Sequence, residues 1–205
     1  MIIGIDISQI AYPGTGVARY VKALLMNMLP DKSYKYHCFF SSLRGTIPPD
    51  IISLIKKTDT KITKLPIPPT LLSWLWNDKH IISIDHFLPD ADIIITSDWT
   101  EPPSEKIKIT IVHDMVIYKH PETTTQKTAW SNDAFAPLPN IAATQKKRLH
   151  WVQKESRLIL ADSYSTKKDV VDILSTDGQR VEVVYPSVMI KKPSRADLQR
   201  VQKKV

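Results

Sequence analysis

Short runs rich in isoleucine and valine alternate along this chain with stretches whose apolar residues recur at helical spacing. The run Ile2–Ile5 is apolar on both faces, which is typical of a strand buried within a parallel sheet. Strands that alternate with helices form a parallel sheet on which the helices pack. The runs that we predict as strands are Ile2–Ile5, Tyr34–Phe40, Lys61–Leu65, Asp92–Thr96, Ile107–Val112, Arg157–Ala161 and Arg180–Tyr185. The sequence therefore predicts an α/β fold, with an open parallel sheet of about seven strands and helices on both of its faces.

Two segments predict helices with identifiable ends. An apolar stripe at helical spacing covers residues 17–28, and Thr15 is the candidate N-cap. A second helix is expected to begin near Ser165, at capping-box spacing, and to stop at Asp177-Gly178.

The composition indicates a globular chain in a reducing compartment. Of its 205 residues, 42% are hydrophobic and 24% are charged, which excludes a mainly disordered chain. The net charge of +7 favours anionic partners such as sugar nucleotides, acidic lipids or nucleic acids. Cys38 is the lone cysteine, so an internal disulfide is excluded. Since the first residues have no basic leader and no run of about 18 apolar residues occurs, we expect a cytoplasmic protein without a membrane span.

The loop after the first predicted strand is a candidate phosphate site. Gly14, Thr15 and Gly16 lead directly into the predicted helix. Glycines let the backbone approach a ligand closely, and a helix N-terminus favours phosphate. The spacing completes neither a Walker loop nor the dinucleotide fingerprint, which requires glycine where this chain has Arg19. A phosphate site and a simple turn both remain open for this loop.

A histidine and a carboxylate follow the predicted strand Ile107–Val112. His113 and Asp114 stand at the carboxyl end of this strand, where ligands of open α/β sheets bind. An imidazole gains or loses a proton near neutral pH, and a neighbouring carboxylate fixes its tautomer. We predict a functional His113–Asp114 pair, with a structural histidine as the alternative. The other five histidines share no metal-ligand spacing, so no metal site is predicted.

Two further loops bring polar or aromatic residues to the same edge of the predicted sheet. Trp99 and Glu101 lie in a proline-stiffened loop after Asp92–Thr96. Ser163, Ser165 and Lys167 follow Arg157–Ala161 at a predicted helix N-terminus, which suits phosphate. A packed tryptophan and an ordinary helix cap are the alternatives.

Two segments combine tryptophans and other apolar residues with lysines. The first is Leu71–Trp76, which Lys79 follows, and the second is residues 146–154, where Trp151 lies among basic residues. Such segments either contact an anionic membrane or pack on the core. The polar stretch Lys119–Asn140 is long enough to indicate a functional connection, and a short amphipathic helix is expected within residues 191–205.

Four segments in this order resemble the N-terminal half of a retaining glycosyltransferase of the GT-B architecture, in the group 1 family (family 4). The segments are Ile3–Asp6 with Gly14–Tyr20, Thr110–Asp114, Ala161–Asp169 and Val181–Val188. In the last segment, Ser187 and Val188 stand where the family often has asparagine and glycine.

The resemblance implies that two domains bind different substrates. Residues 1–190 would form a Rossmann-like acceptor-binding domain and residues 191–205 an interdomain linker helix, while the C-terminal donor-binding domain would be absent from this chain. It also implies that no metal or other cofactor is needed, because helix dipoles and basic side chains balance the donor diphosphate.

The resemblance further implies roles for the candidate residues. Gly14, Thr15 and Gly16 would approach the donor diphosphate, while His113, with Asp114, would lie beside the transferred sugar and act in catalysis. The residues that we then expect at the acceptor are Trp99, Glu101, Ser163, Ser165 and Lys167.

The expected function is therefore the acceptor-binding half of a hexosyltransferase, inactive alone. The donor would be a nucleotide-sugar, with GDP-mannose as one candidate, and the acceptor a glycan or a lipid-linked molecule. The alternative is a non-catalytic α/β module that binds a nucleotide or phosphosugar. Peripheral contact with the inner face of the membrane is a further expectation, whereas nucleic-acid binding is not expected, because the predicted sheet has no aromatic platform.

Overall fold

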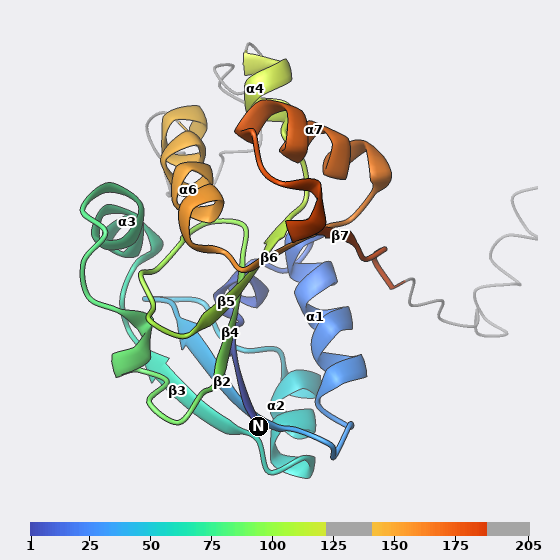
Figure 1. The fold of residues 1–205 in the computed structure, drawn as a ribbon. Coiled ribbons are helices and arrows are strands. Elements are labelled where there is room, and N and C mark those ends of the chain that lie inside the picture. The colour runs from blue at the N-terminus through green and yellow to red at the C-terminus, as the bar shows by residue number, and fades with distance from the viewer. Residues whose placement is uncertain (122–140, 188–205) are drawn as a thin grey trace, which may run out of the picture.

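The computed structural model describes residues 1–121 and 141–187. Within these ranges, seven parallel strands form one open sheet in the order β3-β2-β1-β4-β5-β6-β7 (Figure 1). The strands are β1 (Ile2–Asp6), β2 (Lys35–Ser41), β3 (Lys61–Leu65), β4 (Ile93–Ser97), β5 (Ile107–Val112), β6 (Leu158–Ala161) and β7 (Val181–Val183). The predicted α/β fold class is confirmed, and every predicted strand overlaps an observed one.

Helices connect the strands and cover the sheet on both sides (Figure 1). The α-helices are α1 (Gly16–Met28), α2 (Pro49–Lys57), α3 (Pro69–Ser73), α4 (Val116–Lys119), α6 (Ile141–Glu155) and α7 (Tyr164–Leu174). Helix α3 continues into a π-helical turn, η2 (Trp74–Asp78). Short 3-10 turns form η1 (Ser8–Ala11), η3 (Ile84–His86) and η4 (Gly178–Arg180).

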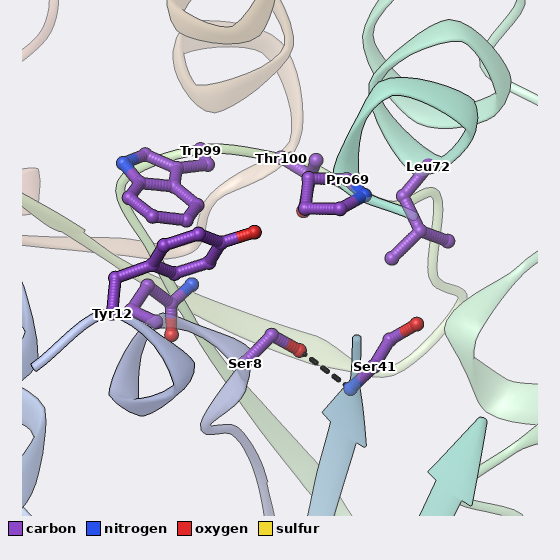
Figure 2. Close-up of a pocket in the computed structure, with 8 residues that line it drawn as sticks. Ser8, Tyr12, Ser41, Pro69, Leu72, Trp99 and Thr100 are labelled. Carbon is purple, nitrogen blue, oxygen red and sulfur yellow. Dashed lines mark hydrogen bonds between the residues drawn. The ribbon is translucent and has the colours of Figure 1, made fainter. Parts of the chain in front are cut away.

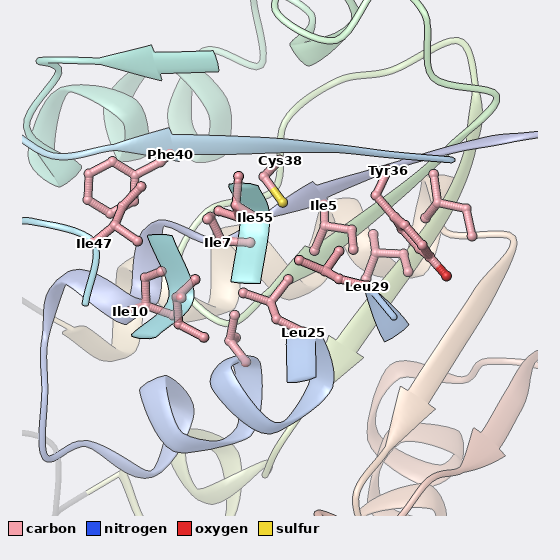
Figure 3. Packing of buried hydrophobic residues seen from close by; sticks show 14 of the residues in the cluster. Ile5, Ile7, Ile10, Leu25, Leu29, Tyr36, Cys38, Phe40, Ile47 and Ile55 are labelled. Carbon is pink, nitrogen blue, oxygen red and sulfur yellow. The ribbon is translucent and has the colours of Figure 1, made fainter. Parts of the chain in front are cut away.

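Strand β2 shows why the strands are apolar on both faces. Cys38 and Phe40 belong to the core between the sheet and helices α1 and α2, together with Leu25 of α1 (Figure 3). Phe39, between them in sequence, belongs instead to the core that contains Trp76 of η2. Because successive side chains of a strand point to opposite faces, each face of the sheet has its own buried layer.

Gly4 of β1 is required by close packing. A Cβ built at this position would lie 2.8 Å from Ile94 Cδ1 and 2.9 Å from Leu88 Cδ1. These distances are shorter than carbon atoms tolerate, so a larger residue at this position would force the neighbouring side chains to shift.

The predicted helix over residues 17–28 is confirmed as α1, and its cap is also as predicted. The side chain of Thr15 accepts a hydrogen bond from Ala18 N–H at 3.1 Å. The second predicted helix begins earlier than expected, since Ser163 caps α7 by accepting from Thr166 N–H at 3.0 Å.

Helix α7 also ends earlier than the Asp177-Gly178 signal predicts. Ser175 takes the left-handed conformation that ends the helix, with φ of 51°. Gly178 instead opens η4, where its conformational freedom is not used. The helix predicted within residues 191–205 and most of the stretch Lys119–Asn140 lie outside the described residues.

Candidate functional site

The loop between β1 and α1 has backbone groups that a ligand can approach. Gly14 has φ of +99°, a left-handed conformation that favours glycine. A Cβ built on Gly16 would meet no atom within 4 Å, so protein packing does not require glycine there. The first N–H groups of an α-helix have no partner within the helix. The loop therefore leaves open space directly in front of the N-terminus of α1.

His113 is held at the end of β5 by residues of three other segments. Its Nδ1 lies 3.3 Å from Asp162 Oδ2, after β6, and its Nε2 lies 3.5 Å from Ser97 Oγ, at the end of β4. The ring of Tyr20 packs edge-on against the imidazole, with centroids 4.8 Å apart. A carboxylate only accepts hydrogen bonds, so the Nδ1 proton points to Asp162. Nε2, whose contact with Ser97 is long, is the ring nitrogen that remains for a ligand.

Asp162, rather than Asp114, is the carboxylate that orients this imidazole. Asp114 Oδ1 accepts a hydrogen bond from Val116 N–H at 3.0 Å and so stabilises the turn that opens α4. Asp162 reaches His113 because β5 and β6 pair in parallel, with Val112 opposite Ala161. Parallel pairing of strands distant in sequence carries no local signal, which is why sequence analysis considered only the adjacent carboxylate.

These groups line one cleft of about 390 Å³. The residues that line it are Gly16, Val17, Arg19, Tyr20, His113, Asp114, Asp162, Pro186 and Ser187. A cleft of this size can accept a small-molecule ligand. The structure therefore brings together Gly16 of the glycine loop and the His113–Asp114 pair, which the sequence presented as separate candidates. Sequence analysis missed Asp162 and Tyr20, and it noted Arg19 only as a departure from the dinucleotide fingerprint.

Charged side chains of both signs line the cleft. Arg19 is exposed in the first turn of α1, beside the helix N-terminus, so this end favours an anion. Asp114 and Asp162 add acidic groups to the lining of the same cleft. Burial, with a smaller contribution from the charge of Asp162, raises the pKa of Tyr20 above its ordinary value. The phenol of Tyr20 therefore stays protonated at neutral pH.

Asp6, at the end of β1, shapes the loop rather than the cleft. Its Oδ1 accepts hydrogen bonds from Ser8 N–H at 2.9 Å and from Ser8 Oγ at 2.6 Å. Burial raises the pKa of Asp6, although the hydrogen bonds from Ser8 act in the opposite direction. The carboxyl thus fixes the turn into η1.

Trp99 belongs to a second, much smaller pocket (Figure 2). Its ring packs edge-on against Tyr12, with centroids 4.6 Å apart. At the floor of this pocket, Ser8 Oγ accepts a hydrogen bond from Ser41 N–H at 3.0 Å. The cavity measures about 10 Å³, which is roughly the space of one water molecule. Trp99 is thus half-buried in a packed contact and does not line the larger cleft.

Glu101 lies in the interior, not at the surface where an acceptor would bind. It is 0% exposed. Its Oε1 accepts from Thr110 Oγ1 at 2.9 Å and lies 3.1 Å from Lys108 Nζ, and its Oε2 accepts from Thr96 Oγ1 at 3.1 Å. Both carboxylate oxygens are therefore occupied by the protein itself. This placement does not support the predicted contact of Glu101 with an acceptor.

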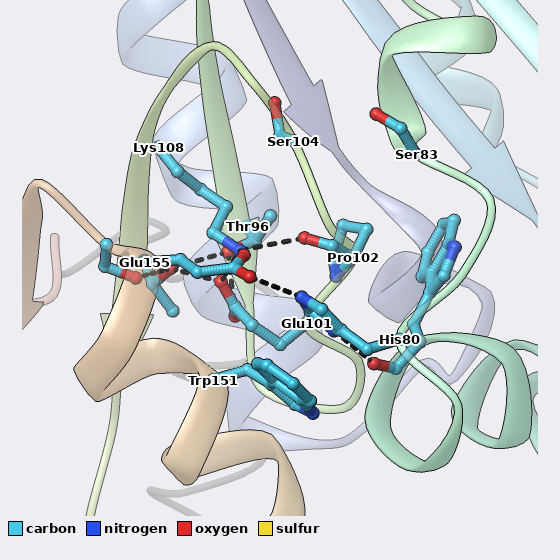
Figure 4. A network of polar contacts seen from close by, with 12 residues as sticks. His80, Ser83, Thr96, Glu101, Pro102, Ser104, Lys108, Trp151 and Glu155 are labelled. Atoms are coloured by element: carbon cyan, nitrogen blue, oxygen red, sulfur yellow. Dashed lines mark hydrogen bonds and ion pairs between the residues drawn. The ribbon is translucent and has the colours of Figure 1, made fainter.

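The buried ion pair of Glu101 and Lys108 continues through Glu155 to His80 (Figure 4). Lys108 Nζ lies 2.6 Å from Glu155 Oε2, and Glu155 Oε1 lies 2.5 Å from His80 Nε2. The imidazole of His80 stacks on Trp151 of α6, with centroids 3.6 Å apart. These contacts thus link the loop after β4 to β5, α6 and the segment after η2.

The three candidates around the start of α7 have different environments. Ser163 is the N-cap and is engaged by Thr166. Ser165 is exposed. Lys167 donates a hydrogen bond to the backbone carbonyl of Val181 in β7. Of the three, only Ser165 has a freely exposed side chain at this helix N-terminus.

Residues 1–121 and 141–187 contain neither a metal-binding cluster nor a membrane-spanning helix. In these ranges no group of three or more His, Cys, Asp or Glu side chains is arranged to hold a metal ion. None of the helices there combines the length and the apolar character that crossing a bilayer requires.

Comparison with known proteins gave matches to solved structures alone. No family model matches the chain, and no curated protein matches its sequence. A glycosyltransferase from Rickettsia africae ESF-5 aligns with 99% of this chain and 48% of its own, at 12% identity and a TM-score of 0.44. A mutant of the Thermobaculum terrenum O-GlcNAc transferase aligns with 92% of this chain and 45% of its own, at 11% identity and a TM-score of 0.32. The chain thus spans about half the length of each of these proteins.

Proposed function

We propose that this chain is the acceptor-binding N-terminal domain of a retaining glycosyltransferase of the GT-B architecture, in the group 1 family. With a second, donor-binding domain it would transfer a sugar from a nucleotide-sugar to a glycan or a lipid-linked acceptor, and alone it would be inactive. One observation carries the proposal: Gly16 and His113, which belong to two of the four segments that resemble this family, line the same cleft.

In this proposal the donor diphosphate lies against the N-terminus of α1. The open space in front of Gly16 admits phosphate oxygens next to backbone N–H groups, with Gly14 and Thr15 shaping the approach. The positive end of the helix and the guanidinium of Arg19 balance the negative charge. These groups supply the charge balance that a metal ion would otherwise provide.

His113 then contacts the sugar that is transferred. Asp162 holds the proton on Nδ1, so Nε2 is presented to a sugar hydroxyl within the cleft. Tyr20 packs against the ring and limits its rotation. In this arrangement Asp162 is a positioning residue, because it acts on the substrate through His113. Asp114 also lines the cleft and remains a candidate for contact with the substrate.

The acceptor is proposed to approach from the rim of this cleft. Ser165 is the predicted acceptor residue whose environment best supports contact with a ligand, because its side chain is exposed. Ser163 and Lys167 are engaged by the protein and Trp99 packs in the second pocket, so their environments add no support for contact with the acceptor. GDP-mannose is the first donor to test.

The test uses the enzyme encoded by the complete reading frame of the source gene, including any part beyond Val205. Sugar transfer would be measured with UDP- and GDP-sugars, GDP-mannose first. We expect His113→Ala to lower kcat by about 100-fold or more while the Tm changes little, since one positioned catalytic group contributes about that factor. Asp162→Asn should reduce kcat and shift its pH profile. His86→Ala, at an exposed histidine of η3, is the matched control.

The isolated 205-residue chain provides the second arm of the test. Titration with nucleotide-sugars, followed by NMR, should perturb the amide signals of Gly16 and His113 without any turnover. Measurable transfer by this chain alone would refute the assignment as half of an enzyme. Tight binding together with an inactive complete protein would instead establish the non-catalytic nucleotide-binding module.

A further inference from the structure

One surface of the molecule exposes apolar side chains that no other part of the described chain covers. Leu71, Trp74, Ile81 and Ile82 are 43%, 47%, 47% and 48% exposed, respectively. They come from helix α3, the turn η2 and the loop that follows it. Clustered exposed apolar residues mark interaction sites more often than scattered ones do. We call these four residues the Trp74 surface.

The loop that carries the two isoleucines is held in an unusual backbone conformation. Ile82 has φ of 62°, which is a genuine outlier for a β-branched residue. Two hydrogen bonds fix the loop: Trp76 Nε1 donates to the carbonyl of Ile82 at 2.8 Å, and His80 Nδ1 lies 2.8 Å from the carbonyl of Trp76. The protein thus maintains a strained loop whose two isoleucines stay exposed.

Helix α6 lies beside the Trp74 surface and extends it. Trp151 Nε1 donates to the carbonyl of Asn77 in η2 at 3.0 Å, and the Trp151 ring stacks on His80. Helices α3 and α6 also lie on the same side of the molecule in Figure 1. Trp151 and Lys147 of α6 are therefore neighbours of η2.

The charged residues among and beside these apolar side chains are mainly basic. Lys79 Nζ lies 5.9 Å from the ring centroid of Trp74, and Lys154 Nζ lies 5.2 Å from that of Trp151. Lys147 of α6 forms an ion pair with Asp78 of η2. Lysines over the faces of tryptophans bring positive charge directly beside apolar area.

We propose that this surface docks the protein peripherally on an anionic lipid bilayer. The Trp74 surface would enter the boundary between headgroups and acyl chains, where tryptophan is favoured. The ammonium groups of Lys79 and Lys154 would meet anionic headgroups, which is the charge complementarity that selects lipid as the partner. The proposal does not depend on the glycosyltransferase assignment, because none of these residues lines the candidate cleft.

Vesicle co-sedimentation of the complete 205-residue chain tests this proposal. We expect binding to phosphatidylcholine vesicles that contain phosphatidylglycerol, with weaker binding at high salt and little binding to phosphatidylcholine alone. The double substitution Leu71→Ser and Trp74→Ser should weaken binding about tenfold or more. Lys79→Gln should weaken it about fivefold, since one lysine near such a surface contributes about 1 kcal/mol. The matched controls are Met26→Ser on α1 and Lys32→Gln after it, both exposed, and both should bind like the wild type.

Brominated lipids give a readout that does not require the serine variants to fold. They should quench tryptophan fluorescence in the wild type, and Trp74→Phe should bind equally well but lose much of this quenching. Three results would overturn the proposal: absence of vesicle binding, equal loss of binding in the control variants, or binding that ignores lipid charge and salt. A dimer in sedimentation equilibrium that Leu71→Ser and Trp74→Ser dissolve, with no vesicle binding, would make the surface an interface between copies of this chain instead.

Discussion

A substitution at Glu101 tests whether this carboxylate stabilises the fold or binds an acceptor. The substitution Glu101→Gln keeps the size of the side chain and removes its charge. It converts two charge-assisted hydrogen bonds, from Thr96 and Thr110, into neutral ones and removes the attraction to Lys108. A hydrogen bond to a charged group contributes about 1.5–3 kcal/mol and a neutral one about 1 kcal/mol. Because Lys108 retains Glu155 as a partner, we expect the free energy of unfolding to fall by about 3 kcal/mol.

The assays are urea denaturation, which gives the free energy of unfolding, and thermal unfolding, which gives the Tm, both followed by far-UV circular dichroism. A loss of about 3 kcal/mol corresponds to a decrease in Tm of about 6–12 °C for a chain of this size. Glu105→Gln is the matched control, since Glu105 lies in the same connection between β4 and β5 and is exposed. We expect this control to change stability by less than about 0.5 kcal/mol.

A double-mutant cycle measures the interaction free energy between Glu101 and Lys108 apart from the contacts that each makes with other residues. Lys108→Met alone leaves Glu101 and Glu155 without the cation between them, so it should cost about 3–5 kcal/mol. Adding Glu101→Leu to Lys108→Met should cost clearly less than the sum of the two single changes, because no unpaired charge then remains at Glu101. If Glu101→Gln unfolds like the wild type but raises the KM for an acceptor in the complete enzyme, the structural interpretation of Glu101 is refuted.

Three further predictions follow from single residues. Gly14→Ala should lower the free energy of unfolding by about 1–2 kcal/mol, because the φ of +99° at this position strains any other residue. Gly16→Ala should leave the free energy of unfolding unchanged and weaken nucleotide-sugar binding measured by calorimetry. Burial raises the pKa of Cys38 to about 12, so its thiol should react with a disulfide reagent only after unfolding in urea; rapid reaction of the native protein would contradict this. Burial lowers the pKa of His37 below 6.5. As the pH falls below 6.5, the unfolded chain therefore binds a proton that the folded chain does not bind, and the free energy of unfolding decreases. His37→Phe should flatten this dependence in urea titrations between about pH 7.5 and 5.5, and an unchanged slope would refute it.

The strands were predictable because the relevant physics is local in sequence. The runs around Ile94, Ile111 and Ile159 are apolar because both faces of a parallel sheet are buried, and their composition shows this without any knowledge of their neighbours. The start of α1 was predictable for the same reason, since Thr15 caps a helix that begins at the next residue. The start of α7 was misplaced because Ser163 and Thr166 can both cap a helix, and the capping-box spacing to Asp169 favoured Thr166. The backbone leaving β6 decides between them.

The candidate site was only partly predictable. His113 and the glycine loop stand at the carboxyl ends of β5 and β1, and position alone marked both as candidates. Asp162 was missed because it is brought to the imidazole by the pairing of β5 with β6. Glu101 was misjudged because a glutamate in a proline-rich loop is usually exposed, whereas here Lys108, itself 1% exposed, draws it into the interior.

The sequence by itself determined the class of fold, the order of strands and helices along the chain, and the glycine loop and histidine at the edge of the sheet. These features depend on apolar periodicity and on residues a few positions apart. The tertiary structure decided which groups meet: Gly16 with His113 across one cleft, Asp162 with the imidazole, Glu101 with a buried lysine, and Lys79 and Lys154 with the rings of Trp74 and Trp151. These contacts join residues far apart in the chain or depend on which face of a helix is buried. They arise from the pairing of strands and the packing of helices, which no short stretch of sequence encodes.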